Sequence, residues 1–355
     1  MKTAAFRMAT TSSSSALPTT MRALLHNQTT QSLTLATSHP TPTPDLAARE
    51  HLLRVSATAL TRGELLWPRP ADAGPYSPGV EMAGEVVEPV PAGSAFPAGT
   101  RVYMRTTFPR CGSARDYAVG REAELARRPR NVSAEEAAAT AVGALTAWQG
   151  LFVHGGVHAV FDDGGKKANA GRRVLVNGAA GAVGMWAVQL ARAAGCEVVG
   201  TASGAAKKAA VRAAGAVEVV DYRETSIRAW AEADEADRKV DLVFDTVGGA
   251  SLDDAWWAVK PAGGLVLSIV PAADMVWRWV LDRPAGVSER VSGKFFIMDS
   301  NGEHLGRVTE LIEQNLARPT VDSVFALEEF EKAFERVDSG KTTGKVVLKV
   351  AGTGA

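Results

Sequence analysis

Sulfur ligands and net charge are what this sequence of 355 residues most clearly lacks. Its cysteines are Cys111 and Cys196, too few for a disulfide framework or a four-thiolate zinc site, so we expect an intracellular, cytoplasmic protein. Lys and Arg together number 39, as do Asp and Glu. The resulting net charge of zero gives no field that would draw the chain onto nucleic acid, and we expect no nucleic-acid partner.

Uninterrupted apolar runs long enough to cross a membrane are also missing. The longest candidate, residues 263–281, contains Pro271, Asp274 and Arg278. A hydrocarbon interior does not accommodate these residues cheaply. The sequence therefore predicts no membrane span.

The start of the chain is rich in Ser and Thr, and no acidic residue precedes Asp45. Lys2, Arg7 and the run from Ser12 to Ser15 fall in this stretch. Because Ser-rich tracts bury too little apolar surface to fold, we expect residues 1–20 to be a disordered leader. The alternative is that this composition marks an organelle transit peptide, which would place the protein in mitochondria.

Two patterns of apolar residues follow the leader. From Met21 to about Arg130, short apolar runs alternate with Pro and Gly clusters, which indicates a β-rich barrel or sandwich. At Ser133 and Glu136 a capping box opens an alanine-rich helical stretch toward Leu151. Beyond it, apolar runs alternate with helical stretches, which indicates parallel βαβ units. The expected strands of this second part are residues 174–177, 197–201, 217–220, 241–245 and 264–270.

Two further stretches complete the pattern. Residues 154–170 are rich in Gly, Asp and Lys and predict a surface loop. His154 and His158 have a spacing that suits metal ligands on a helix, but Gly155 and Gly156 disfavour that helix, so we predict no metal there. After Phe295 the sequence predicts, in order, a helix at 303–316, extended chain to 325, a helix at 327–337 and a last strand at 345–350.

The clearest motif is a strand that runs into three glycines and then into a helix. Residues 173–190 read RVLVNGAAGAVGMWAVQL, with Gly178, Gly181 and Gly184 between the two elements. A tight glycine turn after a strand directs backbone N–H groups and the positive end of the helix dipole at a pyrophosphate. The sequence therefore predicts a dinucleotide-binding site.

The end of the next strand bears on the choice between NADH and NADPH. An acidic residue there would bind a ribose 2′-hydroxyl and repel a 2′-phosphate. This strand instead ends in Thr201, Ala202 and Ser203, followed by Lys207 and Lys208. A hydroxyl and two cations favour a 2′-phosphate, so we predict NADPH. The alternative is that both lysines lie on a solvated helix face.

A series of short motifs then occurs in a fixed order: PGVEMAG at 78–84, GALTA at 143–147, the glycine turn, FDTVGG at 244–249 and GKVVL at 344–348. In these motifs the chain resembles the medium-chain dehydrogenase/reductase family, and within it the zinc-free branch of quinone oxidoreductases and enoyl reductases. The resemblance implies an α/β fold with a Rossmann-type doubly wound parallel sheet domain and a GroES-like β-barrel domain. It implies that residues 21–132 form the first part of the GroES-like catalytic domain, 133–294 the NADP-binding domain, and 295–355 the segment that completes the catalytic domain.

The resemblance also implies which residues surround the cofactor. Thr146 would lie near the nicotinamide, residues 180–183 would hold the pyrophosphate, and Ser203, Lys207 and Tyr222 would surround the 2′-phosphate. Tyr222 could instead simply end a strand. The complete implied set is Thr146, Gly178, Ala180, Gly181, Ala182, Val183, Gly184, Ser203, Lys207, Tyr222, Ser268, Ile269, Phe296, Ile297 and Lys345.

The chain departs from the family in its metal ligands and in its usual proton donor. Val80 occupies the position of a zinc-binding histidine, and an aliphatic side chain cannot bind zinc, so metal chemistry is not expected. Where the zinc-free branch often carries Asn, Asp and Tyr, this chain has Thr61, Glu64 and Trp67. Glu64, Trp67 and the nearby Tyr76 are the candidate catalytic residues, although a loop tyrosine is also common as an exposed amphipathic side chain.

Without a metal, the remaining chemistry is hydride transfer from NADPH to an electrophilic carbon. We therefore expect a reductase of a conjugated carbonyl (an enone or enal) or a quinone, with the proton supplied by Tyr76 or by water. An NADPH-binding sensor or interaction protein without activity, and a zinc alcohol dehydrogenase, are the alternatives. The resemblance also implies a homodimer. Four tryptophans could shape the substrate pocket or pack in the core and dimer interface: Trp256, Trp257, Trp277 and Trp279.

Overall fold

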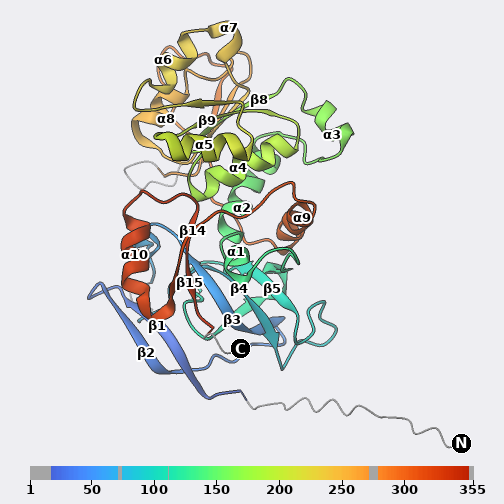
Figure 1. Ribbon diagram of the computed structural model, residues 1–355, viewed down its shortest axis with the longest axis vertical. Coiled ribbons are helices and arrows are strands. Elements are labelled where there is room, and N and C mark those ends of the chain that lie inside the picture. The colour runs from blue at the N-terminus through green and yellow to red at the C-terminus, as the bar shows by residue number, and fades with distance from the viewer. Residues whose placement is uncertain (1–16, 71–73, 111, 272–278, 352–355) are drawn as a thin grey trace, which may run out of the picture.

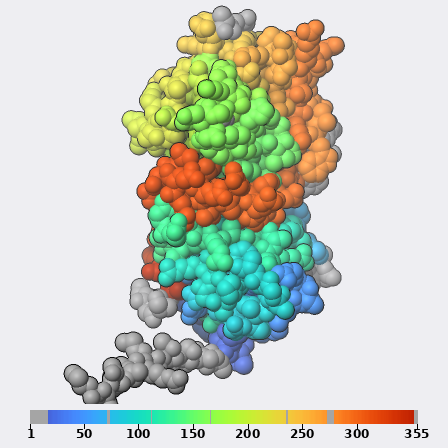
Figure 2. All heavy atoms as spheres, turned by 90° about the vertical axis from the view of Figure 1, so that its right-hand side faces the viewer, coloured from blue at the N-terminus to red at the C-terminus, as the bar shows by residue number. Residues whose placement is uncertain are grey.

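The computed structural model describes residues 17–70, 74–110, 112–271 and 279–351. Most of the predicted leader, residues 1–16, lies outside these ranges, and the first strand begins at Thr20. The described chain forms one domain around a parallel sheet and a second around a mixed sheet (Figure 1). In Figure 2 the C-terminal segment lies as an orange-red band between the parallel-sheet domain and the N-terminal residues. The predicted α/β class is therefore confirmed.

The parallel sheet has the strand order β10-β9-β8-β11-β12-β13. The chain winds outward from β8 in one direction and resumes at β11 on its other side, and this reversal opens a crevice at the carboxyl ends of the strands. Asn177, Asp245 and Ser268 end neighbouring strands in register at that edge. The strands are β8 (Arg173–Asn177), β9 (Glu197–Thr201), β10 (Glu218–Val220), β11 (Leu242–Asp245), β12 (Leu265–Ser268) and β13 (Ser292–Phe295).

Continuous apolar runs form this sheet because helices cover both of its faces. In β8, for example, Val174, Leu175 and Val176 are all completely buried. The capping residue of α6 is Ser226, whose hydroxyl accepts from the backbone N–H of Ala229. The covering helices are α4 (Ala182–Ala193), α5 (Ala205–Ala214), α6 (Ile227–Glu232), α7 (Glu235–Arg238) and α8 (Gly249–Ala255).

The mixed sheet has the order β14-β15-β3-β4-β5-β7, with β6 also paired to β3 and with β1 and β2 forming a separate hairpin. The pairing of β15 with β3 returns the end of the chain to the N-terminal strands. The strands are β1 (Thr20–Asn27), β2 (Ser32–Pro40), β3 (Glu50–Leu60), β4 (Glu81–Val87), β5 (Arg101–Arg105), β6 (Tyr117–Arg121), β7 (Leu125–Arg127), β14 (Val321–Ala326) and β15 (Lys345–Lys349).

Helices α9 (Gly302–Glu313) and α10 (Phe330–Asp338) match the two helices predicted after Phe295. Tyr103 of β5 ties α9 to the mixed sheet, because its hydroxyl donates to Leu305 O at 2.7 Å. Short 3-10 turns occur at η1 (Glu64–Leu66), η2 (Glu122–Glu124) and η4 (Leu327–Glu329). Within the described residues, each helix is too short or too polar to cross a bilayer.

The helix predicted from Ser133 toward Leu151 is interrupted, which corrects the sequence-based expectation. The capping box of Ser133 and Glu136 is confirmed, but α1 (Ala134–Ala138) ends before Thr140 and α2 (Ala141–Trp148) starts anew. Thr140 Oγ1 donates to Glu136 O at 2.9 Å, and Val142 N donates to the carboxylate of Glu81 at 2.7 Å. The carboxylate thus takes the place of a helical acceptor. A π-helical turn, η3 (Gln149–His154), follows α2.

Two other segments differ from the expectation. The predicted loop at 154–170 contains a short helix, α3 (Asp163–Ala168), and Asn169 anchors it by donating to His158 O and Ala194 O. The sequence also gave no sign of β13, whose residues Ser292–Phe295 are mostly part-exposed and lack an apolar run. Phe295, expected in the C-terminal part, therefore belongs to the parallel sheet.

Candidate functional site

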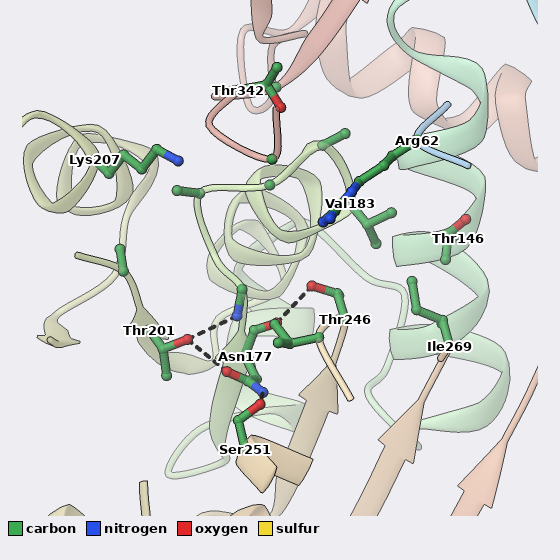
Figure 3. A pocket seen from close by; sticks show the side chains of 18 of the residues that line it. Arg62, Thr146, Asn177, Val183, Thr201, Lys207, Thr246, Ser251, Ile269 and Thr342 are labelled. Atoms are coloured by element: carbon green, nitrogen blue, oxygen red, sulfur yellow. Dashed lines mark hydrogen bonds between the residues drawn. The ribbon is translucent and has the colours of Figure 1, made fainter. Parts of the chain in front are cut away.

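A cavity of about 810 Å³ opens at the carboxyl ends of β8, β11 and β12 and is closed from the opposite side by the mixed-sheet domain. Figure 3 shows the glycine turn and the strand ends on one side, and Arg62 and Thr342 reaching in from the other. Gly181 of the turn forms a backbone bridge with Gly344, so the two domains touch beside the cavity. The predicted residues that line it are Trp67, Thr146, Gly178, Ala180, Gly181, Ala182, Val183, Ser203, Lys207, Tyr222, Ile269 and Lys345.

The glycine turn requires glycine at two of its positions. Gly178 has a positive φ of 80°, and a side chain there would meet Thr246 Oγ1 at 2.4 Å. A Cβ on Gly184 would lie 2.2 Å from Gly178 O. Helix α4 begins just after the turn, and no side chain caps its first N–H groups. These donors and the helix dipole are the arrangement that binds a phosphate group.

Polar side chains at the strand ends hold the turn in place, and sequence reasoning selected Ser268 among them but not Asn177, Thr201 or Asp245. Thr201 Oγ1 accepts from Gly178 N at 2.9 Å and donates to Asn177 Oδ1 at 2.8 Å (Figure 3). Asn177 Nδ2 in turn donates to Asp245 Oδ1 at 2.7 Å. Asp245 also accepts from Ser268 Oγ at 2.7 Å. The only signal in the sequence was their shared position at the ends of apolar runs.

The two lysines of α5 play different parts. Lys207 points into the cavity (Figure 3), which Ser203 and Tyr222 also line. Lys208 instead forms an ion pair with Asp221 at 2.8 Å, and this hydrogen bond lowers the pKa of Asp221. Asp221 therefore neutralises one of the two cations on which the NADPH prediction drew. Asp221 is thus already compensated by a cation of the protein itself.

Ser203 and Tyr222 are joined by a hydrogen bond in which Ser203 Oγ donates to the tyrosine oxygen at 2.7 Å. The hydroxyl hydrogen of Tyr222 has no acceptor among the described residues. Tyr222 is 55% exposed, so its O–H group is available to a ligand. Ser203, Lys207 and Tyr222 together can receive a phosphate group.

The opposite wall contains a buried cluster of charges. Lys345 Nζ lies 2.5 Å from Glu81 Oε1, and it donates to Thr61 Oγ1 at 2.9 Å and to Leu60 O at 3.3 Å. Glu64 Oε1 accepts from Gly79 N at 3.1 Å. Burial raises the pKa of Glu64 to about 7 and also raises the pKa of Glu81, although Lys345 acts in the opposite direction on both.

The candidate catalytic residues are placed differently from one another. Trp67 lines the cavity and packs edge-on against Phe108. Tyr76 is 3% exposed and lies away from the cavity lining, with its hydroxyl 3.0 Å from His26 Nδ1 and the guanidinium of Arg69 over its ring. Tyr76 is thus not the exposed loop side chain that the sequence allowed. Tyr76 therefore does not line the cavity.

Four predicted cofactor contacts also lie outside the cavity lining. Gly184 is inside α4, and its role is the close approach to Gly178. Ser268 is fully buried beneath Asp245, and Phe296 stacks on Phe244 in the core. Ile297 is 44% exposed. Ser268 therefore contacts Asp245 rather than the cavity.

Trp256, Trp257 and Trp279 do not line the cavity, so the structure does not support a pocket-shaping role for these three. Trp256 is buried in the core of the parallel-sheet domain, and Trp257 packs against the guanidinium of Arg228. Trp279 is 57% exposed beside Phe295 of β13. Trp277 lies outside the described residues.

Possible metal ligands are scattered. Among residues 17–70, 74–110, 112–271 and 279–351, no three His, Cys, Asp or Glu side chains converge as ligands would. Val80 is buried at the position of the family's histidine. His154 Nδ1 lies 2.9 Å from Lys294 Nζ. Cys111 lies outside the described residues.

The fold and the cavity define an NAD(P)H-dependent oxidoreductase. Residues 47–130 match the family described as alcohol dehydrogenase GroES-like domain, and residues 214–348 match the one described as zinc-binding dehydrogenase. A probable zinc-binding oxidoreductase, mitochondrial, from Arthroderma benhamiae is 42% identical over 94% of this chain and 98% of its own. The chain belongs to the medium-chain dehydrogenase/reductase family, in agreement with its motifs.

Other relatives are more distant. The chloroplast envelope quinone oxidoreductase homolog of Arabidopsis thaliana is 29% identical over 87% of this chain and 92% of its own. The 2-methylene-furan-3-one reductase of Solanum lycopersicum is 26% identical over 96% and 82%. Two solved structures share the fold: the quinone oxidoreductase from Coxiella burnetii (TM-score 0.75, 23% identity, 93% and 99% covered) and a mycobacterial protein complexed with NADPH (TM-score 0.74, 24% identity, 93% and 100% covered).

Proposed function

We propose that this protein is an NADPH-dependent reductase of an activated C=C bond or a quinone, and that it acts without zinc. The observation that carries the proposal is the group of Ser203, Lys207 and Tyr222 at one end of a cavity whose turn is built for a pyrophosphate. Asp221, the nearby carboxylate, is already paired with Lys208. This end of the cavity therefore suits a 2′-phosphate better than a free 2′-hydroxyl.

The residues present fit a dinucleotide. The uncapped N–H groups of α4 would hold the pyrophosphate, and Arg62, which extends toward Val183 in Figure 3, would add a positive charge. Thr146 and Ile269 would border the nicotinamide. When bound, NADPH supplies a hydride, and the protein's own task is to position the substrate and exclude water.

Part of the cavity wall is apolar, and the proposed substrate would lie against it. Leu60, Trp67, Val142 and Val346 contribute its walls. A flat conjugated carbonyl or quinone suits such walls, and the names of the two plant relatives, a quinone oxidoreductase homolog and a furanone reductase, support this substrate class.

Zinc independence is proposed from the donor set. Val80 stands where zinc-dependent relatives carry a histidine, and Thr61 and Glu64 stand in the segment where those relatives carry a cysteine. An aliphatic side chain offers no lone pair to the metal. Active protein should contain far less than one zinc ion per chain by metal analysis, and stoichiometric zinc would contradict this part of the proposal.

Cofactor binding tests the proposal directly. NADPH fluorescence titrations should show tighter binding of NADPH than of NADH, and Lys207→Ala should weaken NADPH binding about tenfold while leaving NADH binding unchanged. Lys167→Ala, on the exposed helix α3, is the matched control and should change neither affinity. Equal affinities for both nucleotides in the unaltered protein would refute the 2′-phosphate assignment.

Activity and assembly need separate tests. Consumption of NADPH should be screened with conjugated aldehydes, ketones and quinones, and tight NADPH binding without any reduction would favour a sensor role.

We also propose a homodimer, because Trp279 and Val280 are 57% and 70% exposed beside the edge strand β13. Sedimentation should then give twice the chain mass, and Val280→Asp should shift it to that of one chain.

The leader is the basis of a proposal on location. The name of the Arthroderma benhamiae relative includes the word mitochondrial, which favours the transit-peptide alternative over the cytoplasm for this chain. The full chain fused at its C-terminus to a fluorescent protein should co-localise with mitochondria. The same fusion starting at Met21 should not, and cytoplasmic fluorescence from the full chain would contradict the proposal.

A further inference from the structure

The hydroxyl group of Thr61 is held differently from others in the cavity. Lys345 Nζ donates to Thr61 Oγ1 at 2.9 Å, and no described residue accepts the threonine's own hydrogen. Thr146 Oγ1, in contrast, donates its hydrogen to Val142 O at 2.7 Å. Thr61 therefore offers the cavity an O–H donor that an ammonium group polarises from behind.

The ammonium group behind Thr61 is itself positioned by buried charges. Lys345 is only 5% exposed, and Glu81, at the start of β4, holds it in an ion pair. The charges of Glu64 of η1 and Lys345 also attract each other, as do those of Arg105 of β5 and Glu81. A buried environment of low dielectric strengthens each of these interactions. The arrangement fixes Lys345 against Thr61.

We propose that Thr61 is the proton donor of the reduction and that Lys345 resupplies its proton. Glu81 and Glu64 act as positioning residues for Lys345. Thr61 and Lys345 both line the cavity and are joined by a hydrogen bond, whereas Tyr76, the donor first considered, does not line it. This inference rests on the proposed function.

The chemical step is a proton transfer only. Hydride addition at the β-carbon of an enone shifts the C=C pair into a new double bond to the carbonyl carbon. The π pair of the C=O bond moves to the oxygen, which leaves an enolate. The O–H bond of Thr61 then breaks as the enol O–H bond forms, and Thr61 Oγ1 takes a proton from Lys345 Nζ. Lys345 regains its proton from water when the enol leaves, and the enol becomes the saturated ketone by taking a proton from water at its α-carbon and losing its O–H proton to water. Donors aimed at a developing oxyanion stabilise it strongly in a site that excludes water.

The main experiment compares Thr61→Val and Thr61→Ser with the unaltered protein. Removal of the hydroxyl should lower kcat about 100-fold, with KM and NADPH affinity changed less than about threefold, because proton donors act in the transition state. Thr61→Ser restores the hydroxyl and should recover kcat to within about threefold of the original value. Thr34→Val, on the exposed face of β2, is the matched control and should leave all three quantities unchanged.

A binding measurement tests the same group without the cofactor. 4-Nitrophenolate mimics an enolate oxygen, and its absorbance distinguishes the anion from the neutral phenol. The unaltered protein should bind the anion in preference to the phenol, and Thr61→Val should reduce that preference about tenfold, the usual worth of a hydrogen bond to a charged group. No preference in the unaltered protein, with or without binding, would overturn the inference.

The role of Lys345 is tested by asking whether the effects of substitutions at Lys345 and Thr61 on kcat add. The double variant Lys345→Met/Glu81→Gln removes both members of the buried ion pair, so that neither charge is left without a partner. Thermal melting and NADPH affinity report whether this variant folds. Its kcat should fall about as far as that of Thr61→Val, and adding Thr61→Val should lower it by less than about threefold more, because the two residues act as a unit. If the double variant does not fold, Lys345→Arg takes its place, and its kcat should fall because the guanidinium does not readily give up a proton.

The outcomes separate this inference from the function on which it rests. If the unaltered protein binds NADPH but reduces no compound of the panel, the proposed function is overturned and the proton relay with it. If it reduces them and Thr61→Val keeps its kcat, the relay alone is overturned. A fall in kcat that Thr61→Ser does not recover would also overturn it, because only the hydroxyl should matter.

Discussion

Main-chain groups form one wall of the cavity, and buried charged side chains stand behind the other. On the first wall, the glycine turn and the uncapped start of α4 present N–H donors that require no particular side chain. On the second, Lys345 is held by Glu81 and Thr61 within the mixed-sheet domain. Cofactor binding, as proposed, depends mainly on the first wall, whereas the chemistry proposed for the substrate depends on the second.

The two walls also differ in how they affect the stability of the folded state. Glycines at Gly178 and Gly184 avoid steric clashes and leave the backbone donors free. Buried charges instead lose hydration, which hydrogen bonds and ion pairs offset only when every partner is in place. We therefore expect substitutions in the charged wall to affect stability most, and substitutions in the glycine wall to affect binding most.

The largest expected effect is on the charged wall. Glu81→Ala removes the carboxylate from Lys345 and from the N–H of Val142. Since a buried ammonium would then lack its partner, the free energy of unfolding should fall by about 3–5 kcal/mol in denaturant titrations. Glu232→Ala breaks the exposed pair with Arg228 and is the control, with an expected change under about 0.5 kcal/mol. Equal effects of the two substitutions would mean that the buried pair of Glu81 and Lys345 stabilises the protein no more than an exposed pair does.

The free energy of unfolding should also depend on pH because of Glu64, which belongs to the charged wall. The pKa of Glu64 rises from 4.5 to about 7 on folding, because burial disfavours the charged form. The folded state then holds this proton more tightly than the unfolded state, so the contribution of Glu64 to stability is complete below pH 4.5 and is lost as the pH rises through 7. Between these limits the loss is on the order of 3 kcal/mol.

Glu64→Gln isolates this contribution from the rest of the protein. The variant cannot ionise at this position, so the difference in unfolding free energy between the unaltered protein and the variant should decline from pH 4.5 to pH 7.5. Denaturant titrations across this range measure it. A difference that stays constant with pH, or grows, would show that Glu64 is not held as a buried acid.

Substitutions in the glycine turn should change the affinity for NADPH. A Cβ at position 184 would lie 2.2 Å from Gly178 O, so Gly184→Ala forces the turn to move. NADPH affinity should drop about 100-fold, equivalent to about 2.7 kcal/mol, as measured by fluorescence titration. Gly306→Ala in α9 meets no atom within 4 Å and is the matched control, which should raise stability by about 0.5–1 kcal/mol and leave binding unchanged.

The sequence predicted the first wall much better than the second. The turn at 178–184 is local, and its strand and helix follow it directly in the chain, so spacing alone predicted it. The charged wall joins Lys345 to Leu60, 285 positions away, through the pairing of β15 with β3. Neither partner carries a periodic signal, and a buried charge pair can be recognised only once the strands are placed.

The same reason explains the remaining differences. Strands β8, β9 and β11 were predicted because their apolar runs are buried on both faces. The break at Thr140 was missed, because it depends on the carboxylate of Glu81 from another domain. The pairing of Lys208 with Asp221 was missed as well, since it joins α5 to the end of β10. Contacts between distant segments, rather than local preferences, decide each of these points.

The smallest expected effect lies at the 2′-phosphate end, where the first wall relies on a side chain. Ser203 donates to the hydroxyl oxygen of Tyr222, so the hydrogen of that hydroxyl is free to donate to a ligand. Tyr222→Phe removes this hydroxyl and leaves the ring in place. NADPH affinity should fall about tenfold and NADH affinity should not change, because a hydrogen bond to a charged phosphate is lost in one case only. Tyr117→Phe, on β6, is the control. Equal losses for both nucleotides would mean that Tyr222 supports the adenosine half of the site as a whole, and that this wall, like the charged one, depends on side chains throughout.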